Sequence, residues 1–201
     1  LKAAENFNKF KSKKNFIRAQ YKGYRNEKFV ENHSDTETFV AFKLFLDNSR
    51  WNGVPFYIRT GKKLKEKHSL IYVKFKDINI KNIVGLKANV LEMKIYPNMD
   101  VNLYFNAKIP GKMFEATQAK MNFCYSCLFG ENTLKDYAVL LNEVINGDLT
   151  LFTNWAAVKK SWKIIDRVPR YWGKLLQYDK GSFGPREADD LIKRDGREWH
   201  I

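Results

Sequence analysis

The chain has 201 residues, of which 44% are hydrophobic and 15% aromatic, so it can bury a sizeable core and does not belong to the disordered class. No apolar run approaches the about 20 residues that a membrane helix needs, and the N-terminal stretch lacks the apolar segment of a signal peptide. The net charge of +14 raises the hypothesis of a nucleic-acid partner. Half of that charge lies in residues 1–28, where nine basic residues stand against two acidic ones, and we interpret this stretch as solvated.

The first part of the chain has the pattern of strands. Residues 15–21 predict a short strand, and the polar residues 22–35 predict a loop. Residues 36–48 are almost continuously apolar and rich in β-branched and aromatic side chains, which is typical of a central strand covered on both faces. The run at 54–59 predicts a further strand, which leads into a strongly basic segment that ends at residue 68.

Alternating residues predict an antiparallel meander in the middle of the chain. Residues 69–78, 89–97, 100–110 and 120–126 each alternate between apolar and polar side chains, so each strand has one apolar and one wet face. A turn with Pro97 separates the two middle strands. These strands follow one another closely, as neighbouring antiparallel strands do.

Apolar residues then recur three or four positions apart, which predicts helices over 133–147, 153–168 and 185–196. Thr133 is the expected N-cap of the first helix, and Gly147 its C-terminal stop. Many strands followed by helices predict an α+β fold, with a large, mostly antiparallel sheet and helices packed on one face.

The sequence lacks the motifs of common catalytic and nucleotide sites. It has no G-x-G-x-x-G and no G-x-x-x-x-G-K-[ST] segment to cradle nucleotide phosphates. His33, His68 and His200 show no acid–base partner of the kind that proton abstraction requires. Cys124 and Cys127 lie in a predicted strand, where positions three apart face opposite sides. We therefore expect ordinary core cysteines, no metal site, and the reducing setting of the cytoplasm.

The basic segment after the strand at 54–59 is the best candidate site. A strand that ends near Arg59 and Gly61 delivers Lys62 and Lys67 to one rim. Several ammonium groups around one small anion are what a phosphate monoester needs. A hairpin loop with solubilising lysines is the alternative, and the residues alone leave both interpretations open.

Longer stretches closely resemble the carboxyl-terminal domain of the glucose-6-phosphate dehydrogenase family. "RWNGVPFYIRTGK" followed later by "GPREAD" is a specific combination, and the similarity extends from about Asn15 to Trp199. The matching segments are "RAQY" (18–21), "TETFVAFKLFLDNSRWNGVPFYIRTGKKL" (36–64), "NGDLTLF" (146–152), "SW" (161–162) and "GSFGPREADDLI" (181–192).

The resemblance implies an enzyme of the pentose phosphate pathway that oxidises glucose 6-phosphate to 6-phosphogluconolactone with NADP. The family's histidine motif, Asp-His-Tyr-x-Gly-Lys, has no counterpart in this sequence. We therefore expect residues 1–14 to be a basic lead-in from an N-terminal dinucleotide-binding domain that holds the NADP. Residues 15–201 would then be the substrate-side and dimerisation domain, with no catalytic residue of its own and no activity alone.

Two lysines match the family's substrate-contacting positions after the "GVPF" strand. These are Lys62 and Lys67, and the resemblance implies that both reach glucose 6-phosphate. Tyr96 falls where some members place a Gln near the sugar, and it and Arg59 are further substrate-binding candidates. Arg59 also matches a position that in some members touches a second, structural NADP, but Phe183 replaces an Arg of that site, so we expect no structural NADP.

The resemblance also implies a homodimer or tetramer formed through the sheet. Two alternatives to an enzyme domain remain: a basic nucleic-acid-binding module, although no base-reading motif is present, and a structural dimer module without a ligand. We expect no nucleic-acid partner. Either a partner surface or a solvated sheet face is compatible with the mixed polar and aromatic residues of the wet face, which are Tyr72, Lys74, Glu92, Lys94, Tyr104 and Asn106.

Overall fold

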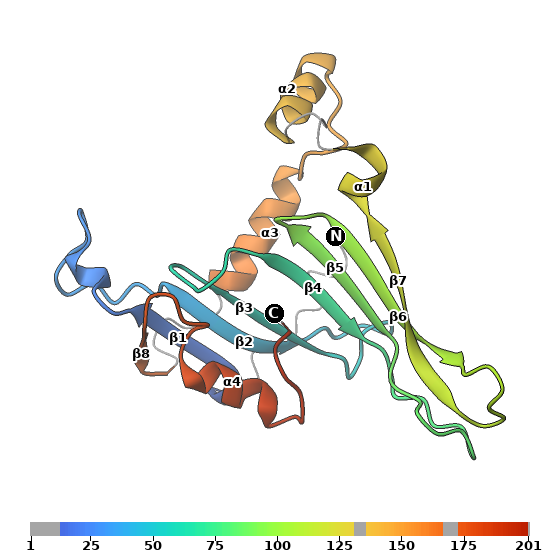
Figure 1. Cartoon of the computed structure of the whole chain (residues 1–201). Coiled ribbons are helices and arrows are strands. Elements are labelled where there is room, and N and C mark those ends of the chain that lie inside the picture. The colour runs from blue at the N-terminus through green and yellow to red at the C-terminus, as the bar shows by residue number, and fades with distance from the viewer. Residues whose placement is uncertain (1–12, 131–135, 167–172, 201) are drawn as a thin grey trace. The chain divides into compact units, whose positions relative to one another are not determined.

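The computed structural model describes residues 13–130, 136–166 and 173–200. The chain divides into two compact units (Figure 1). Unit 1 comprises Leu1–Glu66 and Asp148–Trp199, and unit 2 comprises Lys67–Gly147 and His200–Ile201.

Unit 1 is built on a four-stranded sheet with the order β3-β2-β1-β8. Strand β1 (Phe16–Tyr21) pairs antiparallel with β2 (Phe39–Phe45), and β2 pairs antiparallel with β3 (Pro55–Gly61). The short strand β8 (Leu175–Tyr178) comes from much later in the chain and lies parallel to β1. Short 3-10 helices, η2 (Lys13–Asn15) and η3 (Tyr24–Asn26), flank β1.

Helix α4 (Arg186–Lys193) packs against β1 and β2 (Figure 1) and closes the core of unit 1. Residues 185–196 were predicted as a helix, and the structure confirms it with Pro185 as the N-cap and positive φ at Gly196. Alternate residues of β2 are buried on opposite faces, so the prediction of a central strand covered on both faces is confirmed. The buried cluster on the α4 side contains Ala19, Tyr21, Phe39, Ala41, Tyr178, Ala188 and Leu191, and the cluster on the other side contains Phe16, Phe42 and Leu44.

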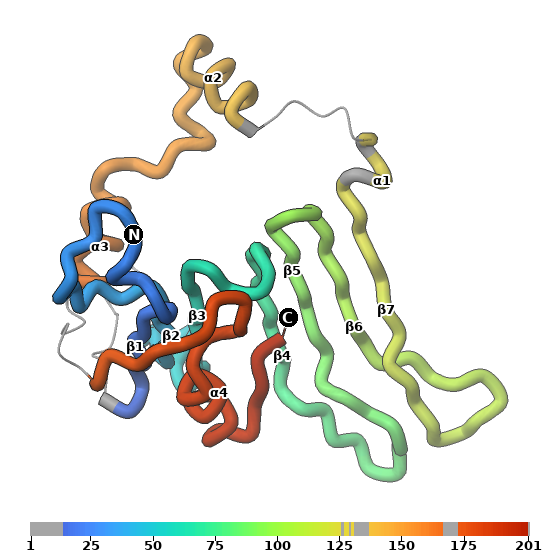
Figure 2. Tube along the Cα trace, turned by 60° about the vertical axis from the view of Figure 1, so that its left-hand side comes forward, coloured from blue at the N-terminus to red at the C-terminus, as the bar shows by residue number. Residues whose placement is uncertain are grey.

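Unit 2 is an antiparallel meander of four strands, β4 (Ser69–Lys74), β5 (Val90–Tyr96), β6 (Asp100–Lys108) and β7 (Ala116–Cys124) (Figure 2). The predicted meander is confirmed, as is the α+β class. The strands of the predicted large sheet are divided between two four-stranded sheets among the described residues.

The two faces of the unit 2 sheet differ in chemistry. On the wet face, Asn102 is buried, donates to Glu92 at 2.7 Å and accepts a hydrogen bond from Asn122 at 2.7 Å. These residues pair directly across β5, β6 and β7, so they form one polar rung across the sheet. The opposite face is apolar, and its exposed residues include Ile71, Ile95, Val101, Met121 and Phe123.

Three further helices, α1 (Tyr125–Phe129), α2 (Asp136–Asn146) and α3 (Trp155–Asp166), complete the described elements. Helices α2 and α3 confirm the predictions over 133–147 and 153–168, and Gly147 ends α2 with a left-handed φ of 70°. The predicted N-cap, Thr133, lies outside the described residues. None of the described helices is long and apolar enough to cross a membrane.

The prediction of core cysteines is wrong. Cys124 and Cys127 form a disulfide, and Cys127 is exposed. The strand ends at Cys124 and α1 begins at Tyr125, and in a helical turn positions three apart lie on the same side rather than on opposite sides.

Candidate functional site

The basic segment that follows β3 is an ordered turn. Strand β3 ends at Gly61, and the chain then turns through Lys62 and Lys63, where φ is 52° at Lys63. Leu64 points inward and packs against the buried cluster on the α4 side. An apolar anchor between exposed lysines fixes the turn to the core, so the segment is more than a solvated loop.

The main chain of Lys62 is held at both of its polar groups. Its N–H donates to the carbonyl of Thr38 at 2.8 Å. Its carbonyl accepts a hydrogen bond of 2.6 Å from the hydroxyl of Tyr178, on β8. The direction in which the Lys62 side chain leaves the turn is therefore set by two elements distant in sequence.

The segment around 181–184, which the sequence marked as "GSFGP", holds the rest of the turn. The N–H of Gly181 donates to the carbonyl of Lys63 at 2.8 Å, and the N–H of Lys65 donates to the carbonyl of Ser182 at 2.9 Å. These reciprocal bonds lock the basic turn to the loop after β8. The two motif segments of the sequence therefore meet in space within unit 1.

Two glycines let these segments approach the ring of Phe39, which is only 1% exposed. A Cβ at Gly61 would come within 2.7 Å of the Phe39 ring, and a Cβ at Gly184 would overlap the same ring. Gly184 also has a φ of 107°, which L side chains rarely adopt. Both motif glycines are therefore needed because their backbones lie directly on this ring.

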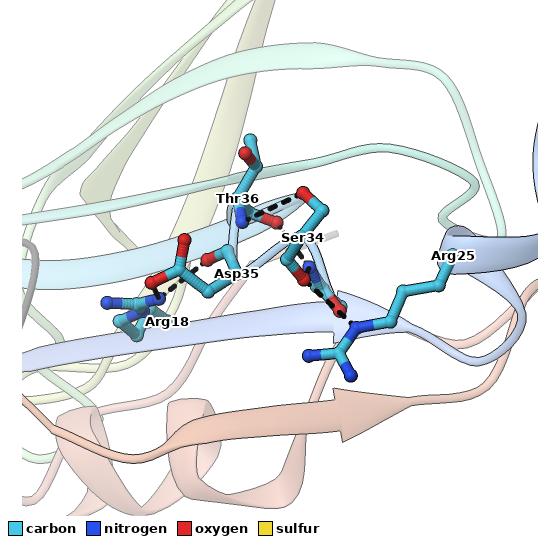
Figure 3. A network of polar contacts seen from close by, with 6 residues as sticks. Arg18, Arg25, Ser34, Asp35 and Thr36 are labelled. Atoms are coloured by element: carbon cyan, nitrogen blue, oxygen red, sulfur yellow. Dashed lines mark hydrogen bonds and ion pairs between the residues drawn. The ribbon is translucent and has the colours of Figure 1, made fainter. Parts of the chain in front are cut away.

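A polar network supports Thr38 from the other side. Arg18, which is buried on β1, donates to the carbonyl of Asp35 at 2.6 Å. The amide of Gln20 donates to the carbonyls of Ser34 and Thr36 at 3.0 and 2.7 Å. These hydrogen bonds fix residues 34–36, which precede Thr38 and β2 in the chain. Figure 3 shows Arg18, Arg25, Ser34, Asp35 and Thr36 in this network.

The side chains of the two predicted substrate lysines lie in different surroundings. Lys62 belongs to unit 1 and is exposed, and it makes no ion pair within the part of the chain that the structure describes. Lys67 belongs to unit 2, where its ammonium lies 4.8 Å from the ring centroid of Tyr96. The structure thus brings Lys67 and Tyr96 together at the end of β5.

Arg59 is engaged inside unit 1. Its guanidinium lies 4.8 Å from the ring centroid of Trp199 and 5.9 Å from that of Phe183, and 4.0 Å from the carboxylate of Asp189. Burial lowers the pKa of Arg59, and the charge of Asp189 partly offsets this. Arg59 therefore fills the space between two aromatic rings, which gives it a structural role near the basic turn.

A second ionic cluster lies near the end of α4. The carboxylate of Asp195 accepts hydrogen bonds from Lys43, at 2.6 Å, and from the hydroxyl of Tyr57. The bond from Lys43, with that from Tyr57, lowers the pKa of Asp195. Burial and the bond to Asp195 raise the pKa of Tyr57 to about 12. This cluster joins α4 to β2 and β3, and it offers no group poised to take up a proton near neutral pH.

The three histidines lie in different surroundings. His33 is exposed, and the Nδ1 of His68 is buried without a hydrogen-bond partner. The ring of His200 stacks on Tyr72, with centroids 3.5 Å apart. Among described residues, no group of three or more His, Cys, Asp or Glu is placed to hold a metal ion.

The sequence interpretation missed two residues that hold the basic turn, Thr38 and Tyr178. Thr38 is the third residue of the "TETF" segment, and Tyr178 lies three residues before "GSFGP". Both stand beside segments that the sequence singled out. Tyr178 lies 116 residues from Lys62 and 140 from Thr38 along the chain, and such pairing has no local signal.

Comparisons with known proteins agree with this architecture. Residues 1–200 match the family described as "Glucose-6-phosphate dehydrogenase, C-terminal domain". A glucose-6-phosphate 1-dehydrogenase of Bacillus subtilis is 41% identical over 202 residues, which cover 92% of this chain and 41% of the relative. The chain thus spans about two fifths of that relative's length. These matches give no support to the nucleic-acid-binding alternative.

Two solved structures share the fold over the whole chain. The crystal structure of glucose-6-phosphate 1-dehydrogenase from Mycobacterium avium is 25% identical, with a TM-score of 0.79, and the chain covers 43% of it. A glucose-6-phosphate dehydrogenase solved in complex with its substrate glucose 6-phosphate is 24% identical, with a TM-score of 0.82, and the chain covers 44% of it.

Proposed function

The chain belongs to the glucose-6-phosphate dehydrogenase family, whose C-terminal domain it matches, and from this premise we propose that it is the substrate-side domain of a glucose-6-phosphate 1-dehydrogenase. The complete enzyme would oxidise glucose 6-phosphate to 6-phosphogluconolactone. NADP would supply the hydride acceptor for C1, and a base outside this chain would take the proton of the C1 hydroxyl. The role of the present residues is to bind and orient the sugar phosphate.

One observation carries this proposal: a rigid turn presents Lys62 with its ammonium unpaired by any described residue. A phosphate monoester carries nearly two negative charges and accepts several hydrogen bonds. Fixing the main chain of the lysine lowers the entropy that binding would otherwise cost. In unit 2, we propose Lys67 as a further contact to glucose 6-phosphate, and Tyr96 beside it as a candidate contact to the sugar.

We place NADP in protein that precedes the described domain. A dinucleotide-binding domain needs a parallel sheet with a glycine-rich turn. In the described residues, β1 and β8 form the only parallel strand pair among the named strands, and the sequence has no such turn. Residues 1–14 would then lead in from that domain, residues 15–201 would form the substrate side, and the chain alone would not turn over substrate.

Kinetics of the complete enzyme test the lysine assignment. We expect Lys62→Ala and Lys67→Ala each to raise KM for glucose 6-phosphate at least about tenfold, because a hydrogen bond between charged groups contributes roughly 1.5–3 kcal/mol. KM for NADP should stay unchanged, as should kcat/KM for glucose, which has no phosphate.

Lys65→Ala is the matched control, because Lys65 lies on the same turn but its ammonium rests over the ring of Phe183. Its KM for glucose 6-phosphate should change little. Equal losses for glucose and glucose 6-phosphate in the Lys62 and Lys67 variants would refute a phosphate contact.

We further propose that the enzyme is a homodimer or tetramer that associates through the wet face of the unit 2 sheet. The polar rung of Glu92, Asn102 and Asn122 is already ordered by its own hydrogen bonds, so it loses little freedom on association. The exposed apolar face needs cover in the complete protein, and we assign that cover to protein outside this chain.

Light scattering of the complete enzyme tests this assignment. Lys94→Glu, which reverses a wet-face charge beside Glu92, should weaken association. Met121→Ala trims the opposite face and should leave the oligomer intact; dissociation by the second variant alone would reverse the assignment.

We place the enzyme in the cytoplasm, since a charged sugar phosphate does not cross a membrane unaided.

A further inference from the structure

A tyrosine hydroxyl joins the basic turn to the loop before β2. The hydroxyl of Tyr178 lies 2.6 Å from the carbonyl of Lys62, 3.1 Å from the hydroxyl of Thr38 and 3.2 Å from the carbonyl of Thr38. The Thr38 hydroxyl also accepts a hydrogen bond of 3.0 Å from the N–H of Tyr21. The hydroxyl of Tyr178 therefore sits at a junction of three segments of unit 1.

The ring of Tyr178 is fixed by its surroundings. The residue is 3% exposed, and its ring centroid lies 5.5 Å from that of Phe39 and 6.3 Å from that of Tyr21. Burial raises the pKa of Tyr178, so the hydroxyl keeps its proton at neutral pH and can donate to the Lys62 carbonyl. A buried carbonyl that loses its donor pays a desolvation penalty, so the turn depends on this hydroxyl.

We propose that Tyr178 is a positioning residue for Lys62: its hydroxyl holds the main chain of the turn so that the lysine meets the phosphate of the substrate. The inference rests on the proposed function, because it names what orients the proposed phosphate contact. Tyr178 itself does not touch the substrate. Its effect reaches the ligand through the direction in which Lys62 leaves the backbone.

The test uses the complete enzyme with the variants Tyr178→Phe, Lys62→Ala and the double variant. Tyr178→Phe keeps the packed ring and removes only the hydroxyl. We expect it to raise KM for glucose 6-phosphate about two- to tenfold, the range of one lost hydrogen bond, with KM for NADP and kcat/KM for glucose unchanged. In the Lys62→Ala background the same change should have no further effect, because the positioned group is gone.

Tyr21→Phe is the matched control. It removes a hydroxyl from a second tyrosine of the same buried cluster, and that hydroxyl interacts with Glu27 rather than with the basic turn. Its KM for glucose 6-phosphate should equal that of the parent enzyme. A similar rise in both Phe variants would mean that the core is merely loosened and would overturn the proposal.

Thr38→Val is the second route should Tyr178→Phe not fold. It removes the hydroxyl that contacts Tyr178, and we expect the same selective rise in KM for glucose 6-phosphate. Thr38→Ser keeps this hydroxyl and should leave that KM unchanged. Additive effects of Tyr178→Phe and Lys62→Ala would overturn the positioning role. An unchanged Lys62→Ala enzyme would instead overturn the proposed phosphate contact, so the two failures are distinguishable.

Discussion

The two units each contain a four-stranded sheet, yet they bury their side chains very differently. Among the described residues, the buried apolar side chains other than Ala88 and Val90 belong to unit 1. There, α4 covers one face of the sheet and a second cluster lies on the other. In unit 2, large apolar side chains such as Met121 and Phe123 remain exposed.

This difference separates two ways of supporting a lysine that we propose to bind substrate. Lys62 stands on a turn tied to a buried ring and to backbone from three segments, so unit 1 orders it without outside help. Lys67 precedes β4, and its ammonium lies over the ring of the half-exposed Tyr96, the last residue of β5. We infer that unit 1 carries its rigidity in its own core, whereas the sheet of unit 2 relies on what covers its apolar face.

The largest expected contrast comes from truncating one aromatic residue in each unit. Phe39→Ala should lower the free energy of unfolding by about 3–5 kcal/mol, because it leaves a cavity in a packed core. Phe123→Ala, at a residue that is 46% exposed, should lower the free energy of unfolding by less than about 1 kcal/mol. Urea denaturation measures both, and equal losses would refute the contrast between the units.

Glycine replacement sharpens the same comparison. Gly184→Ala should cost roughly 2–4 kcal/mol of the free energy of unfolding, because it combines a clash with Phe39 and a strained backbone. Gly111→Ala, in unit 2, has a φ of 77° but nothing within 4 Å of the added Cβ, so only about 1–2 kcal/mol of backbone strain remains. Thermal unfolding of both variants checks this, and a costlier Gly111→Ala would count against the account.

The disulfide of unit 2 should have a smaller effect. Cys124 and Cys127 are three residues apart, and so short a loop removes little entropy from the unfolded chain, worth at most about 2 kcal/mol. Replacing both by Ser should lower the free energy of unfolding by no more than that. Adding a dithiol reductant should reproduce the loss in the parent chain and have no effect on the double Ser variant.

The smallest expected effect is a pH dependence from Asp195. Its pKa lies below the ordinary value of 3.8, so as pH falls the unfolded chain takes up this proton first. The contribution of Asp195 to stability is therefore present above about pH 4 and is lost as pH falls through the folded-state pKa. Between pH 6 and pH 3, the urea midpoint should fall less steeply for Asp195→Asn than for the parent chain. Equal slopes for the two proteins would show that Asp195 contributes nothing to the pH dependence of stability.

Periodicity predicted most of the fold. The alternation of β4 to β7 and the apolar stripes of α2 to α4 are local patterns, so the sequence alone was sufficient to predict these elements. Strand β8 has only four residues and pairs with β1 from far along the chain, and neither property leaves a local signature. The disulfide was missed because the strand pattern was extended past Cys124, where the backbone turns into α1.

The candidate site was predicted in part. The lysines stood out as a charged run after a strand, but the residues that order them did not. Thr38, through its carbonyl, and Tyr178, through its hydroxyl, contact the main chain of Lys62, and neither contact has a motif in the sequence. The assignments of Lys62, Lys67, Arg59 and Tyr96 to substrate binding stay predictions, and the engagement of Arg59 between two rings favours a structural role for it.

A double-mutant cycle on Lys62 and Lys67 tests the central claim most directly. The measurement is kcat/KM for glucose 6-phosphate, with glucose as reference, in the complete enzyme and its Lys62→Ala, Lys67→Ala and doubly substituted forms. If Lys62 and Lys67 both contact glucose 6-phosphate, each single variant should lose at least about tenfold in kcat/KM for it, the double variant should lose more than either, and glucose turnover should not change. Independent losses that are equally large for glucose would contradict it.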